Sequence, residues 1–88
     1  MSDYEQIVIS AVRYALGRMT WIVNLTVEYV IKSIDNKELS KKCLQLIKRD
    51  IVEELHPDKL RVDSIFTADI IKEWQRLLKK IDEVMEVE

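Results

Sequence analysis

The two helices expected in the N-terminal third of this chain are apolar over most of their circumference. Hydrophobic periodicity predicts them at Ser2–Leu16 and Thr20–Ile34. Their polar residues form only thin stripes: Asp3, Gln6, Ser10, Arg13 and Gly17 on the first helix, and Asn24, Glu28 and Lys32 on the second. A helix on the surface of a monomer usually has one apolar stripe and a broad polar face. These two helices therefore need cover on two sides, which predicts self-association or a protein partner.

The chain is short, with 88 residues that we interpret as a single helical domain, residues 1–88. A domain of this size buries a limited fraction of its surface, so association with another copy would add stability. The single cysteine, Cys43, excludes an internal disulfide and is expected to be a small core residue of the third helix. One cysteine and one histidine are too few for a zinc site, so we expect neither a metal nor another cofactor.

Charge and hydropathy exclude two classes of partner. No run of 18 or more apolar residues occurs, so no membrane-spanning segment is expected. The net charge is −2, and no broad basic field is present to support general nucleic-acid binding. A free thiol without a signal peptide favours the reducing cytoplasm, here that of a host cell.

The remaining sequence also has the helical period. The second helix has two apolar stripes, Val23, Val27, Val30, Ile31 and Ile34 on one side and Trp21, Leu25 and Tyr29 on another. A third helix is expected from about Ser40 to Leu55, and its core-facing residues are Leu44, Ile47, Ile51 and Leu55. A fourth helix is expected to begin near Thr67, and its apolar seam consists of Ile70, Trp74, Leu77, Ile81 and Val84. We therefore predict an all-α bundle of three to four helices that oligomerises through the first two.

Local signals mark several helix ends. Ser2 and Glu5 form a capping-box pattern at the start of the first helix, and Gly17 is a natural stop at its end. Thr20 is expected to cap the second helix. Pro57 ends the third helix, and residues 58–66 are expected to form a loop or a short turn.

The junction of the first two helices is the best candidate binding site. Arg13 and Arg18 lie on either side of Gly17, and Thr20 opens the next helix. Free amides at a helix N-terminus together with a guanidinium group can bind an anion, either a nucleotide phosphate or a carboxylate of a partner. Tyr14 or Trp21 could stack on a neighbouring base or ring. The alternative is that the arginines pair with acids such as Asp3 or Glu28.

His56-Pro57-Asp58 matches the signature tripeptide of J-domain co-chaperones. There the tripeptide follows a basic helix, and Lys48 and Arg49 lie on the preceding helix here. The acids Asp50, Glu53 and Glu54 oppose this interpretation, because they lie on the last turns before the motif. The tripeptide also has a simpler explanation as a helix stop with a cation near the C-terminal dipole.

Three segments resemble small uncharacterised proteins of bacteriophages and prophages of Gram-positive bacteria. The segment from Ala11 to Val23, AVRYALGRMTWIV, is similar to an AVRYALGR-x-T-aromatic-I-V run near the N-terminus of these proteins. Ile47–Ile51 resembles an I-x-R-D-I segment and Trp74–Leu78 a W-x-x-L-L segment. The likeness covers about two thirds of the chain and has no counterpart for residues 57–69. It implies a phage origin and no settled activity, so no catalytic role is carried over.

The sequence thus favours a binding protein over an enzyme, because no paired carboxylates or His-containing catalytic arrays are evident. We expect an interaction protein that binds and inhibits a host factor, in an anti-CRISPR-like or other anti-defence role. One alternative is sequestration of a nucleotide-type signalling ligand at Arg13, Arg18 and Thr20. The other is a J-domain-like co-chaperone acting through His56-Pro57-Asp58.

Overall fold

In the residues that it describes, the computed structural model contains four α-helices, which confirms the all-α prediction. They are α1 (Asp3–Ala15), α2 (Thr20–Asp35), α3 (Lys41–Glu54) and α4 (Thr67–Glu86). The structure describes residues 1–56, 58 and 67–86. Pro57, expected to stop the third helix, and residues 59–66, expected to form a loop or turn, lie outside the described residues.

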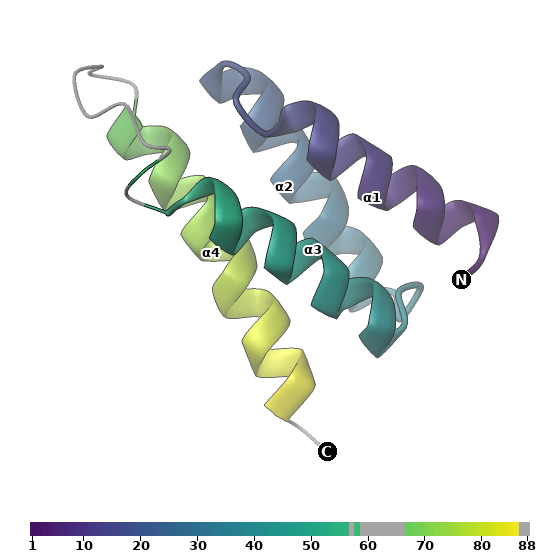
Figure 1. Ribbon diagram of the computed structural model, residues 1–88. Helices are drawn as coiled ribbons and strands as arrows, with labels where there is room; N and C mark the ends of the chain where they lie inside the picture. The colour runs from purple at the N-terminus through teal and green to yellow at the C-terminus, as the bar shows by residue number, and fades with distance from the viewer. Residues whose placement is uncertain (57, 59–66, 87–88) are drawn as a thin grey trace.

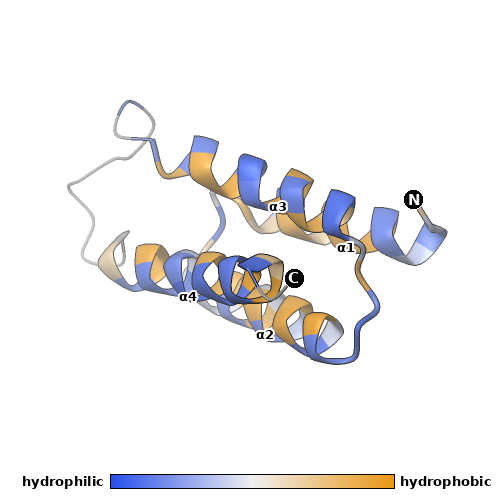
Figure 2. Ribbon diagram, turned by 90° about the horizontal axis from the view of Figure 1, so that it is seen from below, coloured by the Kyte–Doolittle hydropathy of each residue, from blue (hydrophilic) through white to orange (hydrophobic). Residues whose placement is uncertain are grey.

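The helices form two layers, with α1 and α3 in one layer and α2 and α4 in the other (Figure 2). α1 and α3 run in roughly the same direction, and α2 and α4 run in the opposite direction (Figure 1). Each helix has two neighbours: α1 packs on α2 and α3, and α4 packs on α2 and α3, with the closest packing between α2 and α4. α1 therefore lies diagonally across the bundle from α4.

One hydrophobic core, to which all four helices contribute, fills the space between the layers. Trp74 is its largest side chain and is 1% exposed, as expected from its place in the seam of the fourth helix. Cys43 is fully buried on α3, as predicted. The other buried apolar residues are Val8, Ile9, Val12, Ala15, Val23, Val27, Val30, Ile34, Leu44, Ile47, Ile51, Leu77 and Ile81. Val84, assigned to the seam from sequence, is instead partly exposed at the end of α4.

Helix starts follow the sequence signals at α1 but not at α2. The capping box at α1 is confirmed, because the Ser2 hydroxyl accepts from the Glu5 amide and the Glu5 carboxylate accepts from the Ser2 amide. The prediction that Thr20 caps α2 is wrong. Thr20 is the first residue of α2, and the cap position is occupied by Met19, which makes no side-chain capping bond. The N-terminus of α2 therefore lacks the side-chain acceptor that α1 has.

Gly17 ends α1 as predicted. Its φ angle is +80°, a left-handed conformation that glycine adopts without steric cost. The Arg18 amide then donates to the Ala15 carbonyl at 3.0 Å, which turns the chain back toward α2. This reversal brings α1 and α2 together as an antiparallel hairpin (Figure 1).

α2 also ends with a residue in the left-handed conformation, but this residue is not a glycine. Lys37 has a φ angle of +58°. Its amide donates to the Ile34 carbonyl and the Glu38 amide donates to the Ser33 carbonyl, both at 3.0 Å, which is the Schellman pattern. A residue with a Cβ atom is strained in this conformation, so the backbone strain at Lys37 lowers the stability of the folded state.

Lys37→Gly is therefore expected to stabilise the protein by about 0.5–1 kcal/mol, because glycine removes this cost. Urea unfolding followed by circular dichroism measures the change. Lys37→Ala is the matched control, since it removes the same charge but keeps the Cβ atom, and it should bring no such gain. Equal stabilities of the glycine and alanine variants would contradict the explanation.

Ion pairs connect neighbouring helices along three of the four packed edges. Arg13 pairs with Asp50 between α1 and α3 at 2.8 Å, and Lys48 pairs with Asp82 between α3 and α4 at 2.6 Å. The α2–α4 edge has two pairs: Arg76 with Glu28 and Lys80 with Asp35. Among the described residues, no ion pair joins α1 to α2; there the Tyr4 hydroxyl shares a hydrogen bond with Ser33. The α1–α2 edge is therefore the least polar of the four.

None of the described helices combines the length and the apolar character that a membrane span requires. The long apolar segments of α1 and α2 are instead divided between the core and the protein surface.

Candidate interaction surface

Exposed apolar side chains gather on the α1–α2 hairpin. Nine large apolar side chains are exposed within the described part of the chain, and seven of them lie in residues 1–29. These seven are Met1, Ile7, Tyr14, Met19, Trp21, Leu25 and Tyr29. The bundle thus leaves part of the apolar surface of these two helices exposed. Clusters of this kind on a small protein mark interaction sites more often than single exposed residues do.

The turn between α1 and α2 combines apolar side chains with one cation. Tyr14 and Met19 are both more than half exposed, and the Arg18 guanidinium lies over the Tyr14 ring, 4.7 Å from its centre. We call Tyr14, Arg18 and Met19 the turn surface. Within the described residues, no carboxylate is recorded as a partner of Arg18. A cation stacked on an aromatic ring and left without an acid is available to a partner.

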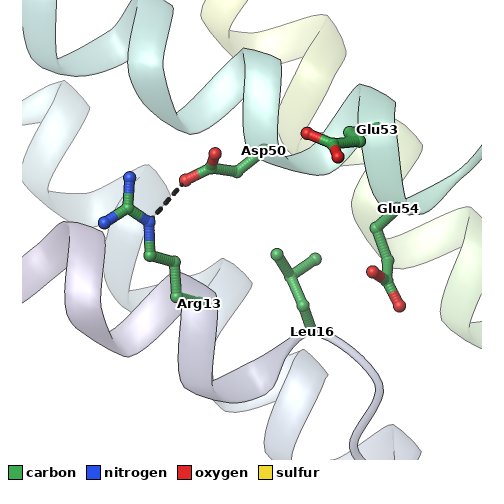
Figure 3. Close-up of a pocket in the computed structure, with 5 residues that line it drawn as sticks. All are labelled: Arg13, Leu16, Asp50, Glu53 and Glu54. Carbon is green, nitrogen blue, oxygen red and sulfur yellow. Dashed lines mark hydrogen bonds and ion pairs between the residues drawn. The ribbon is translucent and has the colours of Figure 1, made fainter.

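Arg13 does not belong to this surface. Its Nε donates to the Asp50 carboxylate of α3 at 2.8 Å (Figure 3). Arg13 and Arg18 therefore have different partners, one on α3 and the other on α1 itself. The pairing with acids that the sequence left open occurs for Arg13, but with Asp50 and not with Asp3 or Glu28. Glu28 is instead bound by Arg76.

Beside this pair lies an open cleft of about 310 Å³ between the C-terminal ends of α1 and α3. Leu16 forms its floor, and Asp50, Glu53 and Glu54 line its α3 side (Figure 3). Asp50 and Glu54 place two carboxylates beside the Arg13 guanidinium, so this part of the cleft is acidic. An anion would meet repulsion here, so Arg13 is poorly placed to bind a phosphate.

The other two predicted site residues lie at the start of α2. Thr20 is partly buried as the first residue of the helix, and no acidic residue lies in the first turn. Trp21 is exposed, and its indole N–H donates to the Met19 sulfur. The structure thus brings Tyr14, Arg18 and Trp21 to the same end of the hairpin and directs Arg13 away toward α3.

The co-chaperone motif is only partly described. His56 and Asp58 are both exposed, and the Asp58 amide donates to His56 Nδ1 at 3.3 Å. The preceding turns of α3 carry the acidic side of the cleft. The described turns of α3 before His56 thus carry Asp50 and Glu54, whereas the corresponding helix of a J-domain is basic.

Glu5 makes two sets of contacts, of which the sequence predicts only one. Its Oε1 accepts from the Ser2 amide and hydroxyl, and its Oε2 accepts from the Ser40 amide at 2.8 Å and hydroxyl at 2.6 Å. One carboxylate thus joins the N-terminus of α1 to the N-terminal cap of α3. The Ser40 hydroxyl and the other donors lower the pKa of Glu5 to about 2. The pattern Ser2-x-x-Glu5 predicts the contact with Ser2. No local pattern predicts the contact with Ser40, which lies 35 residues away in the sequence.

Cys43 is buried next to this junction, and its amide donates to the Ser40 hydroxyl. Loss of hydration on burial raises the pKa of its thiol to about 11, and the Glu5 charge acts in the same direction. The thiol is therefore protonated at neutral pH and unreactive. Within the described ranges, no group of three His, Cys, Asp or Glu side chains could hold a metal ion.

Comparisons of the chain with protein families, with curated proteins and with solved structures find no match.

Proposed function

We propose that this protein is a phage or prophage interaction protein that binds a host protein through the turn surface and blocks its activity. An anti-CRISPR-like or other anti-defence role is the form we favour, and we expect no catalysis of its own. The observation that carries the proposal is the exposed cluster of Tyr14, Arg18 and Met19. Tyrosine and arginine are among the residues that most often dominate the energy of protein interfaces.

The resemblance to phage proteins also favours the turn between α1 and α2 as the binding region. The segment that resembles the phage proteins, residues 11–23, begins in α1, includes the turn and ends in α2. It therefore contains the whole turn surface and Trp21. Packing in the core does not explain the whole segment, because five of its large side chains are exposed: Arg13, Tyr14, Arg18, Met19 and Trp21.

The turn surface also suggests the chemistry of the partner. Arg18 supplies a planar cation, and the first turn of α2 lacks an acid to offset the positive end of the helix dipole. Tyr14 and Met19 supply apolar contact around the cation. A partner that presents a carboxylate surrounded by apolar side chains would satisfy both features.

The two alternatives receive less support. Sequestration of a nucleotide-type ligand required both arginines, and Arg13 is bound by Asp50 beside an acidic cleft. A co-chaperone role required positive charge before His56, where Asp50, Glu53 and Glu54 lie instead. Both remain predictions, and the capture experiment below would detect either a bound nucleotide or a chaperone.

Arg18→Glu is expected to abolish binding of the host protein while leaving the fold intact, because Arg18 is exposed and makes no ion pair that the structure describes. A lost charge-assisted contact of this kind costs about 1.5–3 kcal/mol, which is a loss of at least tenfold in affinity. The measurement is affinity capture from a Gram-positive host lysate, with mass spectrometry of the bound proteins and small ligands.

Arg49→Glu is the matched control, since Arg49 is an exposed arginine on α3, away from the turn. The proposal requires one host protein to be recovered with the parent and with Arg49→Glu, but not with Arg18→Glu. Equal recovery with both variants would place the contact elsewhere on the molecule.

A further inference from the structure

A second apolar surface lies along α2, beyond the turn. Trp21, Leu25 and Tyr29 are spaced four residues apart, so they form a single line along the helix. Their exposed fractions are 61%, 61% and 43%. We call these three residues the α2 ridge. Three large apolar side chains in one unbroken line present a continuous surface to solvent.

Three polar side chains of α2 are directed toward α4, whereas Lys32 lies on the ridge face, one turn beyond Tyr29. Asn24 donates to Glu73 at 3.0 Å, Glu28 accepts from Arg76 at 2.7 Å and Asp35 pairs with Lys80 at 2.5 Å. All three contacts lie on the α4 side of the helix. These three polar groups therefore leave the line from Trp21 to Tyr29 uninterrupted, and the charge of Lys32 lies beyond its C-terminal end.

The apolar surface continues from the ridge onto α1. The Tyr4 ring packs against Tyr29 with 6.3 Å between ring centres. One turn further along α1 lies Ile7, which is 61% exposed. In the described part of the chain no ion pair joins α1 to α2, so no charged pair crosses the edge beside Ile7.

The size of the surface fits a stable dimer. With roughly 150–250 Å² for each large side chain, the exposed parts of the ridge and Ile7 amount to about 450 Å² of apolar area. One partner in an interface of standard size contributes about 800 Å², of which about 57%, or about 450 Å², is non-polar. The ridge and Ile7 supply an apolar area of that size.

We propose that a second copy of the chain covers the α2 ridge in a twofold-symmetric dimer, with Leu25 on the symmetry axis. Three evenly spaced residues are self-complementary on reversal: Leu25 meets Leu25 of the second copy, and Trp21 meets Tyr29 of the second copy. Ridges with a four-residue spacing interdigitate at a crossing angle of about −50°. Lys32 lies about 10 Å from Leu25 along the helix, on opposite sides of the axis in the two copies, so the two lysines stay apart.

The dimer goes beyond the proposed function and does not depend on it. Its contacts are centred on Leu25, whereas host binding is assigned to Arg18 and Tyr14. Two turn surfaces would then project from opposite ends of the paired α2 helices, so one dimer would present two binding sites.

Leu25→Arg is expected to convert a dimer into a monomer, because it places two guanidinium groups at the axis. Sedimentation velocity at micromolar concentration reports the mass, and circular dichroism verifies that the helices persist. Val52→Arg is the matched control, since Val52 is an apolar residue of α3 that is 49% exposed, and it should remain a dimer. A monomeric parent protein, or an assembly larger than two chains, would overturn the proposal.

A cross-link tests the register independently of any effect on folding. Leu25→Cys is expected to form a disulfide between two chains under mild oxidation, because residues on the axis approach within the roughly 4.4–6.8 Å between Cα atoms that a disulfide needs. Cys43 is buried and should not compete. Val52→Cys, the control, should remain uncross-linked. A Leu25→Cys protein that stays monomeric on denaturing gels, or a Val52→Cys protein that cross-links as readily, would exclude the proposed axis.

Discussion

Trp74→Ala is expected to unfold the domain. Trp74 is 1% exposed and lies in the core cluster formed by all four helices. Replacing a buried tryptophan with alanine costs about 3–5 kcal/mol, because it removes apolar contacts and leaves a cavity. Small domains are stable by about 5–15 kcal/mol, and a chain of this length is expected near the lower limit. Thermal unfolding followed by circular dichroism should show a much lower melting temperature or no folded baseline.

Two further variants separate packing from hydrogen bonding. The indole N–H of Trp74 has no acceptor among the described residues, so Trp74→Phe loses no recorded hydrogen bond and keeps most of the ring volume. We expect Trp74→Phe to cost less than about 1.5 kcal/mol. Tyr14→Ala, which truncates an exposed aromatic residue, should cost less than about 1 kcal/mol. A Trp74→Ala protein as stable as Tyr14→Ala would refute the core role of Trp74.

Glu5→Gln is expected to lower the melting temperature by several degrees at neutral pH, and the loss should disappear in acid. The glutamine keeps the shape but not the charge, and its amide nitrogen opposes donors that the carboxylate accepted. The pKa of Glu5 is lowered from 4.5 to about 2 by the donors of Ser40 and Ser2. A carboxylate with a lowered pKa stabilises the fold above its unfolded-state pKa, and this contribution is lost as the pH falls toward the folded-state value.

The difference in stability between the parent and Glu5→Gln should therefore be constant above about pH 5 and shrink as the pH falls from 4.5 toward 2. Thermal melts across this range measure it. Glu83→Gln, which changes an exposed carboxylate of α4, is the control and should change the melting temperature little at any pH. A Glu5→Gln deficit that persists unchanged at the lowest pH would show that the charge is not what joins α1 to α3.

Local sequence patterns predicted the helices well because helix formation depends on near neighbours. The Ser2 and Glu5 capping box and the Gly17 stop both involve residues within one turn of each other. The Schellman turn at Lys37 was not predicted, because lysine is an unusual residue in a left-handed conformation. Thr20 was assigned as a cap from its type alone, and the chain placed Met19 there instead.

The candidate site was predicted in part for the same reason. The exposure of Trp21, Leu25 and Tyr29 follows from a second apolar stripe, which is a property of one helix. The separation of Arg13 from Arg18 could not be predicted from one helix. It depends on Asp50, which lies 37 residues after Arg13 in the sequence and binds it. Similarly, Glu5 could be assigned to its own helix but not to Ser40.

The sequence by itself thus determined four helices in outline, one core face on each, and an excess of apolar surface on the first two, because these features depend on the spacing of residue types within single helices. Only the tertiary structure decided which acids bind which bases, which edge of the bundle lacks ion pairs, and where the excess apolar surface lies. Those features depend on how helices distant in sequence are aligned side by side, and no pattern within one helix specifies that alignment.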